Sequence, residues 1–410
     1  MKQGGIPYLR MAPCLFAIII DAMGFGLVYP VMTLIFMSSH SPVLPVDASS
    51  ALRHFYLGVG FMLYPLCMLF GTAFLSDCSD NFGRKRILSL CMLFIGLSFL
   101  LMALGVVFSS IWLLFIGRAL SGLMAGSQPV AQASIADIST PETKAKNMGI
   151  VSLSYCFAVM LGPLIGGVTS DSSLWSGFNF STPFFIAAVL AFLACVWVIV
   201  GFHDTFQPQG HKKLHLLRPL TLFVAAFKHP LIRLLVVAFV LMQLGYSIYF
   251  QFIVVHMQHA FHYSAWQLGL LNSMLGIGFG LGILVGLPIF LKFWSTKTIA
   301  LITGVLTGVC LLLSGLIHFA APQWALAILI AGFNMMLFTV MMTLFSDSVA
   351  KTEQGWAMGI FSAVIALSWT VTGFASNLIG SIGTNGLILL GGLIMLLGTL
   401  VVAFNRPREL

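Results

Sequence analysis

The residues best placed to do chemistry are two charged side chains inside long apolar runs. Asp21 interrupts the run CLFAIIIDAMGFGLVYPVM, and Arg118 interrupts IWLLFIGRALSGLMAG. A charged group at bilayer depth costs several kcal/mol and is by default a functional-site hypothesis. Counted along ideal helices, the depths of the two groups differ by about 5 Å, which an arginine side chain can span. We therefore predict that Asp21 and Arg118 couple the protein to proton movement; the alternative is a permanent ion pair that only satisfies both charges.

Long apolar helices must position these charges. The chain has 410 residues, of which 59% are hydrophobic and only 7% are charged, a composition typical of membrane proteins. About 20 helical residues cross the hydrocarbon core, and only helices or closed barrels satisfy their backbone in lipid. Apolar runs of sufficient length lie at 11–37, 54–75, 87–108, 111–136, 148–170, 183–203, 231–258, 266–291, 298–319, 323–348, 356–380 and 385–404. The predicted fold class is all-α integral membrane, with twelve transmembrane helices.

The basic residues predict the orientation of these helices. Of the 19 lysines and arginines, only Arg53 falls in an outer loop and only Arg118 falls within a span, if the N-terminus is cytoplasmic. We therefore expect both termini in the cytoplasm and an uncleaved first helix, in the inner membrane of a bacterium. The net charge of +8 follows from this topology, so no nucleic-acid partner is expected.

Two related halves organise the chain. The hydrophilic stretch 204–230 predicts a cytoplasmic linker between six-helix bundles at 1–203 and 231–410. The segment ADISTPETKAKNMGIVS at 136–152 recurs as SDSVAKTEQGWAMGIFS at 346–362, with Asp137 matching Asp347. Repeats of this kind are typical of secondary transporters, which bind substrate between the halves near the midplane.

Four motifs resemble those of the major facilitator superfamily, and within it the twelve-helix drug:proton antiporters that include the tetracycline exporters. The first is DAMGFGLVYPV from Asp21. The second is the loop SDCSDNFGRKR, where Asp80, Gly83, Arg84 and Lys85 fit, whereas Ser76 and Asn81 depart from the usual glycine and arginine. The third is RALSG from Arg118. The fourth, the antiporter motif, comprises Gly149, Gly162, Pro163, Gly166 and Gly167.

The resemblance implies roles for these residues. It implies alternating access coupled to protons, with the first-helix aspartate important for transport and the Arg118 motif linked to proton transfer. Arg84 can pair with Asp137, or an acidic loop residue can cap a helix N-terminus. Either contact would latch the inner side in the outward-open state; the alternative is a loop that only fixes topology. Small residues in the fourth motif predict close helix packing, and Pro163 predicts a bend.

The C-terminal half supplies most of the predicted substrate contacts. Apart from histidines, it has no intramembrane ionisable residue, so we assign protons and gating to the N-terminal half. Polar or aromatic residues that could line a cavity, or instead face a neighbouring helix, are Tyr29, Gln243, Tyr246, Tyr249, Asn272, Asn334, Trp369 and Asn377. A neutral cavity of this kind suits an amphipathic or weakly charged solute. His256, His259 and His262 are better explained as interfacial residues than as metal ligands, and no metal site is predicted.

These observations predict a proton-coupled exporter of an amphipathic small molecule. An importer on the same fold, a proton symporter for a nutrient, remains an alternative. An integral membrane enzyme or lipid-handling scaffold is a remote one, because the chain shows no P-loop, H-E-x-x-H, paired carboxylates or nucleophile elbow. The expected partners are a small-molecule substrate, protons and the lipid bilayer. We expect a functional monomer with no cofactor, driven by the proton gradient.

Overall fold

The computed structural model describes residues 7–39, 41–203, 221, 223, 227, 232–349 and 354–404. The predicted linker at 204–230 therefore lies almost wholly outside the described residues. The described secondary structure is helical throughout, which confirms that the fold is all-α.

The N-terminal helices follow the predicted apolar runs closely. They are α1 (Pro7–Met37), α2 (Ser50–Phe82), α3 (Arg84–Val107), α4 (Ile111–Leu123), α5 (Ser127–Asp137), α6 (Pro141–Thr169) and α7 (Thr182–Gly201). A 3₁₀ turn at Met124–Gly126 joins α4 to α5, so the predicted span at 111–136 is one interrupted helical segment. At this level a Cβ on Gly126 would lie 2.5 Å from the Leu75 Cβ of α2, so glycine allows the close approach.

The C-terminal helices are α9 (Arg233–Phe261), α10 (Ala265–Leu281), α11 (Leu287–Phe293), α12 (Thr296–Leu316), α13 (Ala320–Asp347), α14 (Gln354–Gly373) and α15 (Ile379–Phe404). A π-helical turn at Gly282–Gly286 connects α10 to α11. Gly383 has φ 70°, which lets the backbone turn inside the continuous stretch that contains two predicted spans.

Ten helical segments of the described chain are long and apolar enough to cross a membrane. Trp356–Phe404 counts as one of the ten although it covers two predicted spans, and the interrupted α4–α5 segment is not among them. The count of twelve crossings therefore stays a prediction.

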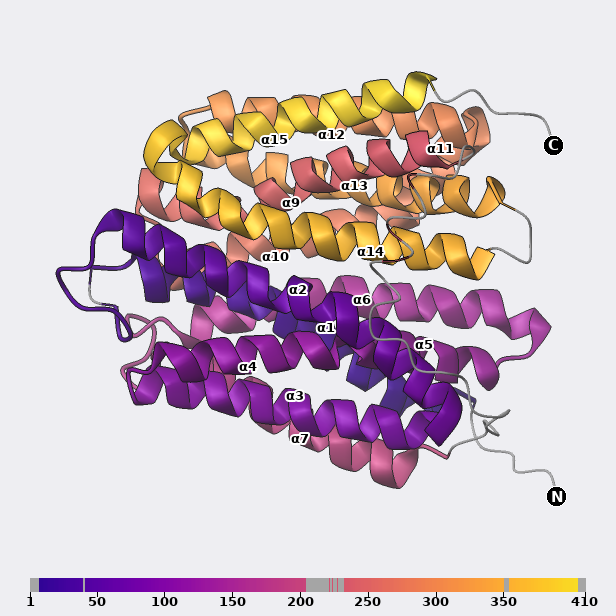
Figure 1. Ribbon diagram of the computed structural model, residues 1–410, viewed down its shortest axis with the longest axis horizontal. Helices are drawn as coiled ribbons and strands as arrows, with labels where there is room; N and C mark the ends of the chain where they lie inside the picture. Colours follow the sequence, from indigo (N-terminus) through magenta and orange to yellow (C-terminus); the bar gives the residue numbers. More distant parts are fainter. Residues whose placement is uncertain are drawn as a thin grey trace.

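Helices from the two ends of the sequence occupy opposite sides of the bundle. Figure 1 shows α1–α7, in indigo to magenta, on one side and α9–α15, in orange to yellow, on the other. The closest packing between these groups is α6 with α10 and α2 with α14. The exact boundaries of the two bundles stay a prediction.

Close backbone contacts between the two groups lie toward the end that carries residues 41–49, the predicted outer end, and the α2–α14 contact continues inward to Leu69 and Ala363. A Cβ on Gly167 would lie 2.7 Å from the Gly269 Cα, and a Cβ on Gly58 would lie 2.8 Å from the Gly373 carbonyl oxygen. Toward the opposite end of the described chain, α5 packs closely only with helices of its own group, and so does α13, which runs from one end of the bundle to the other. The described conformation is therefore closed at the predicted outer end.

Candidate functional site

Asp21 is buried in the middle of α1, with 4% of its surface exposed. The Ser127 hydroxyl donates a hydrogen bond to Asp21 Oδ2 at 2.6 Å. Ser127 is the first residue of α5, directly after the 3₁₀ turn. The interruption of the predicted 111–136 span therefore places a hydroxyl donor beside Asp21, the acidic residue of α1.

Arg118 of α4 is 1% exposed and lies against α2. Its Nε donates to the Gly60 carbonyl oxygen at 3.2 Å. Its guanidinium carbon lies 4.7 Å from the centre of the Tyr64 ring and 5.7 Å from that of Tyr29, distances typical of cation–π contacts. Arg118 Nη2 and the Tyr29 hydroxyl are both buried without a hydrogen-bond partner among the described residues, although the two side chains are neighbours.

Asp21 and Arg118 do not form an ion pair in this conformation. Among the described residues, Arg84 forms ion pairs with Asp80 and with Asp137, whereas none joins Asp21 to Arg118. The permanent Asp21–Arg118 pair considered as an alternative is therefore wrong for this conformation. The physical reason is that each charge has another partner, a serine hydroxyl for Asp21 and two aromatic faces with a carbonyl for Arg118.

An aromatic cluster joins the two groups of helices one turn from Asp21. Phe25 is its hub, with ring centroids 5.2–5.9 Å from those of four rings, Tyr29, Tyr64, Phe250 and Trp369. Phe250 and Trp369 belong to α9 and α14, whereas the other three belong to α1 and α2. Phe25 is nevertheless only half-buried. The cluster thus brings both halves together beside the two charges.

Three of the predicted cavity residues of the C-terminal half lie at or beside this cluster. Trp369 is a member, and the Tyr246 ring lies 6.5 Å from it. The Trp369 indole N–H donates to Gln243 Oε1 at 3.4 Å. The Tyr246 hydroxyl is buried without a hydrogen-bond partner among the described residues. The predicted Tyr29, Gln243, Tyr246 and Trp369 are therefore close together.

The other four predicted cavity residues are more dispersed. Asn272 of α10 is 1% exposed, and neither its amide nitrogen nor its amide oxygen has a hydrogen-bond partner in the described chain. Asn334 is buried in α13. Tyr249 lies beside Ser314 and Cys310 of α12, not in the cluster. Asn377 is exposed and donates to the Phe374 carbonyl oxygen. Tyr249 and Asn377 therefore lie apart from the aromatic cluster, and their role as cavity residues stays a prediction.

The loop motif forms the predicted ion pair. Arg84 Nε donates to Asp137 Oδ2 at 2.9 Å, and its Nη1 lies 2.9 Å from Asp80 Oδ1. Gly83 has φ 95°, a left-handed conformation that favours glycine, at the junction of α2 and α3. The Arg84–Asp137 pair joins α3 to α5, two helices of the same half, and it coexists with a closed outer end. It therefore does not by itself link the halves.

The antiporter motif packs α6 against two different helices. A Cβ on Gly166 would lie 2.7 Å from the Leu27 carbonyl oxygen of α1, and Gly162 approaches α1 even more closely at Met23. Gly167 instead meets Gly269 of α10. Gly149 is different, because a Cβ added to it would have no other atom within 4 Å. The described motif therefore mediates close packing in the outer part of α6 only.

Sequence reasoning missed Asp171, which links the halves at the predicted outer end. Asp171 Oδ2 accepts a hydrogen bond from the backbone N–H of Trp266 at 3.2 Å, at the start of α10. Burial acts to raise the pKa of Asp171, but hydrogen bonds from Ser173 and from the Trp266 amide outweigh it and lower the pKa. The carboxylate is therefore ionised where it meets the positive end of the α10 dipole.

The reasoning also missed Ser127 and Phe25. A signal for Phe25 existed, because Asp21, Phe25 and Tyr29 recur every four residues and share one face of a helix. Ser127 had no comparable signal. Among the histidines, His256 Nδ1 lies 3.0 Å from Thr384 Oγ1, whereas His259 and His262 are exposed. The described residues contain no cluster of three metal-ligating side chains.

Comparison with known proteins gives consistent similarities. The sequence pattern of the family described as Major Facilitator Superfamily matches residues 14–335 and 253–410. The tetracycline resistance protein, class B, of Escherichia coli is 32% identical over 187 residues, 46% of this chain and 42% of that protein. The quinolone resistance protein NorA of Staphylococcus aureus is 27% identical over 359 residues, 86% of this chain and 85% of that protein.

A solved structure shows the same fold. The D-xylose-proton symporter superposes with a TM-score of 0.69 over 96% of this chain and 98% of that chain, at 15% sequence identity.

Proposed function

The chain belongs to the major facilitator superfamily, and we propose that it is a proton-coupled exporter of amphipathic small molecules. It is a secondary transporter and not an enzyme. Proton coupling and the direction of transport are the parts that we propose. We further propose that it works as a monomer in the inner membrane of a bacterium, with two helical bundles divided at the 204–230 segment.

The observation that carries the proposal is the placement of Asp21. Its carboxyl is buried, its bonded partner is a neutral hydroxyl, and it lies one helical turn from an aromatic cluster built by both halves. A carboxyl without a permanent cation can exchange a proton when its surroundings change. Because Phe25 and Asp21 share a helix face, movement of the halves about the cluster would alter the surroundings of the carboxyl.

The conformation fits one stage of alternating access. The predicted outer end is closed by α6 on α10 and α2 on α14, whereas in the described chain the inner segment α5 and the full-length helix α13 are not closely packed across the halves. Such a state would accept substrate from the cytoplasm. Parting of Gly167 from Gly269 would then open the opposite side. A membrane potential supplies about 2.3 kcal/mol per charge per 100 mV to such a cycle.

The proposed direction of transport and the proposed substrate class are supported by the similar proteins and by the aromatic cluster. The similar proteins named above are a tetracycline and a quinolone resistance protein, which favours export of amphipathic, ring-containing compounds. The neutral cluster of Phe25, Tyr64, Phe250 and Trp369 suits such rings by stacking. The D-xylose-proton symporter shares the fold, so an importer on this fold is the competing function.

Inside-out vesicles from cells that express the chain test the proposal. The vesicles are acidified inside by respiration, and aromatic amphipathic compounds, tetracyclines among them, are then added while internal pH is recorded. An antiporter releases protons when a substrate is added. We expect Asp21→Asn to abolish this release. The matched control, Asp47→Asn, removes a carboxylate from an exposed outer loop residue and should leave the release intact.

Two outcomes would contradict the proposal. Proton release that survives Asp21→Asn would show that another group couples transport. If the protein is inserted and folded but an added sugar or metabolite makes the vesicle interior more acidic instead, the chain is an importer.

A further inference from the structure

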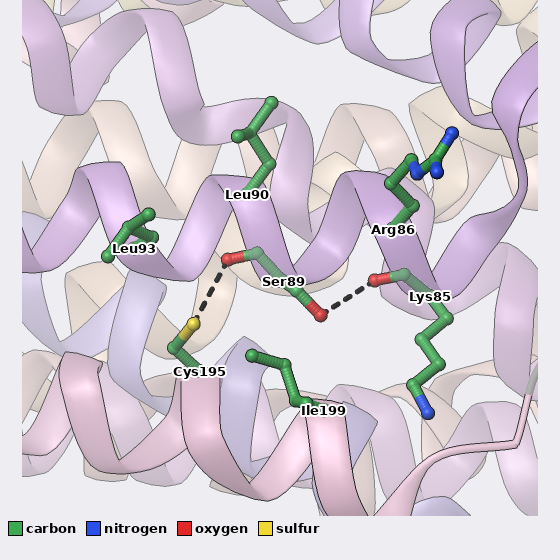
Figure 2. A pocket seen from close by; sticks show the side chains of 7 residues that line it. All are labelled: Lys85, Arg86, Ser89, Leu90, Leu93, Cys195 and Ile199. Atoms are coloured by element: carbon green, nitrogen blue, oxygen red, sulfur yellow. Dashed lines mark hydrogen bonds between the residues drawn. The ribbon is translucent and has the colours of Figure 1, made fainter.

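A shallow groove of about 540 Å³ lies between α3 and α7, away from the Asp21 site. Figure 2 shows Lys85 and Arg86 at one end of the groove and Leu93 and Cys195 toward the other. The lining residues are Lys85, Arg86, Ser89, Leu90, Leu93, Cys195 and Ile199. None belongs to the aromatic cluster, so this groove is not the proposed substrate path.

The packing of α3 on α7 explains why the groove exists. At Gly96 the helices are tight, because a Cβ there would lie 2.6 Å from the Phe192 ring. Nearer the start of α3, the small residues Ser89 and Cys195 line the groove instead. Cys195 Sγ donates to the Ser89 carbonyl oxygen at 3.3 Å, and the Ser89 hydroxyl donates to the Lys85 carbonyl oxygen at 2.8 Å. The polar atoms of the floor are thus satisfied internally.

The walls and the end of the groove differ in chemistry. Leu90, Leu93 and Ile199 are 39–50% exposed on helices that span the membrane, so their exposed surface meets acyl chains. Lys85 and Arg86 lie in the first turn of α3, the end that the basic residues place in the cytoplasm. An apolar channel that ends in two cations matches a lipid with an anionic head group. Basic pockets between helices on the cytoplasmic side bind such head groups.

We propose that this groove binds one anionic phospholipid of the cytoplasmic leaflet. Its head group lies at the cytoplasmic end of the groove, flanked by the side chains of Lys85 and Arg86, which point to opposite sides of α3 (Figure 2), and one acyl chain follows Leu90, Leu93 and Ile199. The preceding residue, Arg84, pairs with Asp80 and Asp137. The head group therefore sits directly beside the loop motif. This inference concerns lipid binding alone and does not depend on the proposed function.

Native mass spectrometry of the purified full chain tests the proposal. The protein is equilibrated with equal amounts of phosphatidylglycerol and phosphatidylethanolamine, and retained adducts are counted. We expect one preferentially retained phosphatidylglycerol. Each basic residue near an anionic head group contributes about 1 kcal/mol, which is about five-fold in occupancy. Arg86→Gln should therefore reduce phosphatidylglycerol occupancy about five-fold. Ile199→Trp, which fills the apolar part, should reduce it as well while leaving both cations in place.

Two control variants match these changes outside the groove. Arg233→Gln removes a cation at the start of α9, and Val200→Trp adds a ring at the adjacent residue of α7, which does not line the groove. Both should retain the lipid as the unaltered protein does. Equal retention of the two lipids, or the same loss in Arg233→Gln as in Arg86→Gln, would overturn the proposal. Thermal unfolding of each variant without added lipid confirms that it is folded.

Discussion

The carboxylate of Asp171 accepts a hydrogen bond from the backbone N–H of Trp266, 95 residues away along the chain. Asp171 follows α6, and Trp266 lies in the first turn of α10, so this bond joins the two halves at the closed end, which is the predicted outer end. It lies beside the contact between Gly167 and Gly269. A charged acceptor thus holds the start of a helix that must move away when the outer side opens.

Asp171→Ala should shift the protein toward the outward-open state. Removing a carboxylate that caps a helix costs roughly 1 kcal/mol, which is about five-fold in the population of the closed state. Asp171→Asn keeps an acceptor and should have a smaller effect. Distances between spin labels at Leu174 and Phe319, two exposed residues at the outer end, measure the shift in a cysteine-free background. Unchanged distances in Asp171→Ala would show that the bond does not hold the outer end.

The outer bond should not respond to physiological pH. Hydrogen bonds lower the pKa of Asp171 in the closed state. The contribution of this carboxylate to the free energy of the closed state is therefore fully present at every pH above the ordinary carboxyl pKa of about 3.9. It is lost only as the pH falls through the lower pKa of the closed state. Between pH 5 and pH 8, the spin-label distances of Asp171→Ala should therefore differ from those of the unaltered protein by a constant amount. A difference that disappears at pH 5 would contradict this assignment.

Gly167→Val should prevent closure of the outer end. Its Cβ would meet the backbone of Gly269 at 2.7 Å, and a backbone contact cannot be relieved by turning a side chain. We expect a larger outer spin-label distance and at least about ten-fold slower transport, since a population shift of 1.4 kcal/mol already gives ten-fold. Gly280→Val is the control, because no atom lies within 4 Å of the position of its Cβ. Equal transport by both variants would refute the steric argument.

Arg118→Lys should lose transport although it keeps the positive charge. The guanidinium donates to the Gly60 carbonyl oxygen and lies over the Tyr64 ring, and an ammonium group cannot reproduce this planar arrangement. Loss of a desolvated cation–π contact is worth about 2 kcal/mol, so a reduction of more than ten-fold is expected. Drug-stimulated proton release per inserted protein measures it. Full activity of the lysine variant would show that only the charge matters.

Phe25→Ala should weaken substrate binding more than it slows transport at saturation. Phe25 contacts four rings from both halves and is itself only half-buried. Its loss removes stacking worth about 0.5–1.5 kcal/mol for each aromatic partner. We expect the substrate KM to rise about ten-fold. Phe319→Ala, at an outer position that is 74% exposed, is the control. A lower maximal rate with unchanged KM would place Phe25 in the conformational step instead.

Local rules were sufficient to predict part of this structure. The burial of Asp21 follows from the apolar residues around it, and the Arg84–Asp137 pair was expected from the loop motif. The interruption at Met124–Gly126 was not predicted, because a 3₁₀ turn does not alter the apolar pattern. The separation of Tyr249 from the aromatic cluster could not be predicted either, because Tyr249 lies on the same helix as Tyr246 and only the rotation of α9 decides which tyrosine faces the cluster.

Contacts between distant segments could not be predicted at all. Ser127 meets Asp21 only because α5 packs beside α1, and Asp171 meets Trp266 only when the halves are closed. In the sequence, Ser127 and Asp171 do not differ from many other serines and aspartates near helix ends. Such partners depend on how whole helices pack against one another, and the apolar periodicity of a single sequence does not determine this packing.

The meeting of Gly167 with Gly269 has a consequence for how readily the outer end reopens. Glycine has no side-chain rotamers, whereas ordering a long side chain at an interface costs up to about 2 kcal/mol in conformational entropy. Closure by backbone against backbone therefore freezes almost no side-chain freedom at this point, and reopening releases almost none. The two states can then remain close in free energy, so that modest inputs such as a proton or a bound solute decide which one is populated.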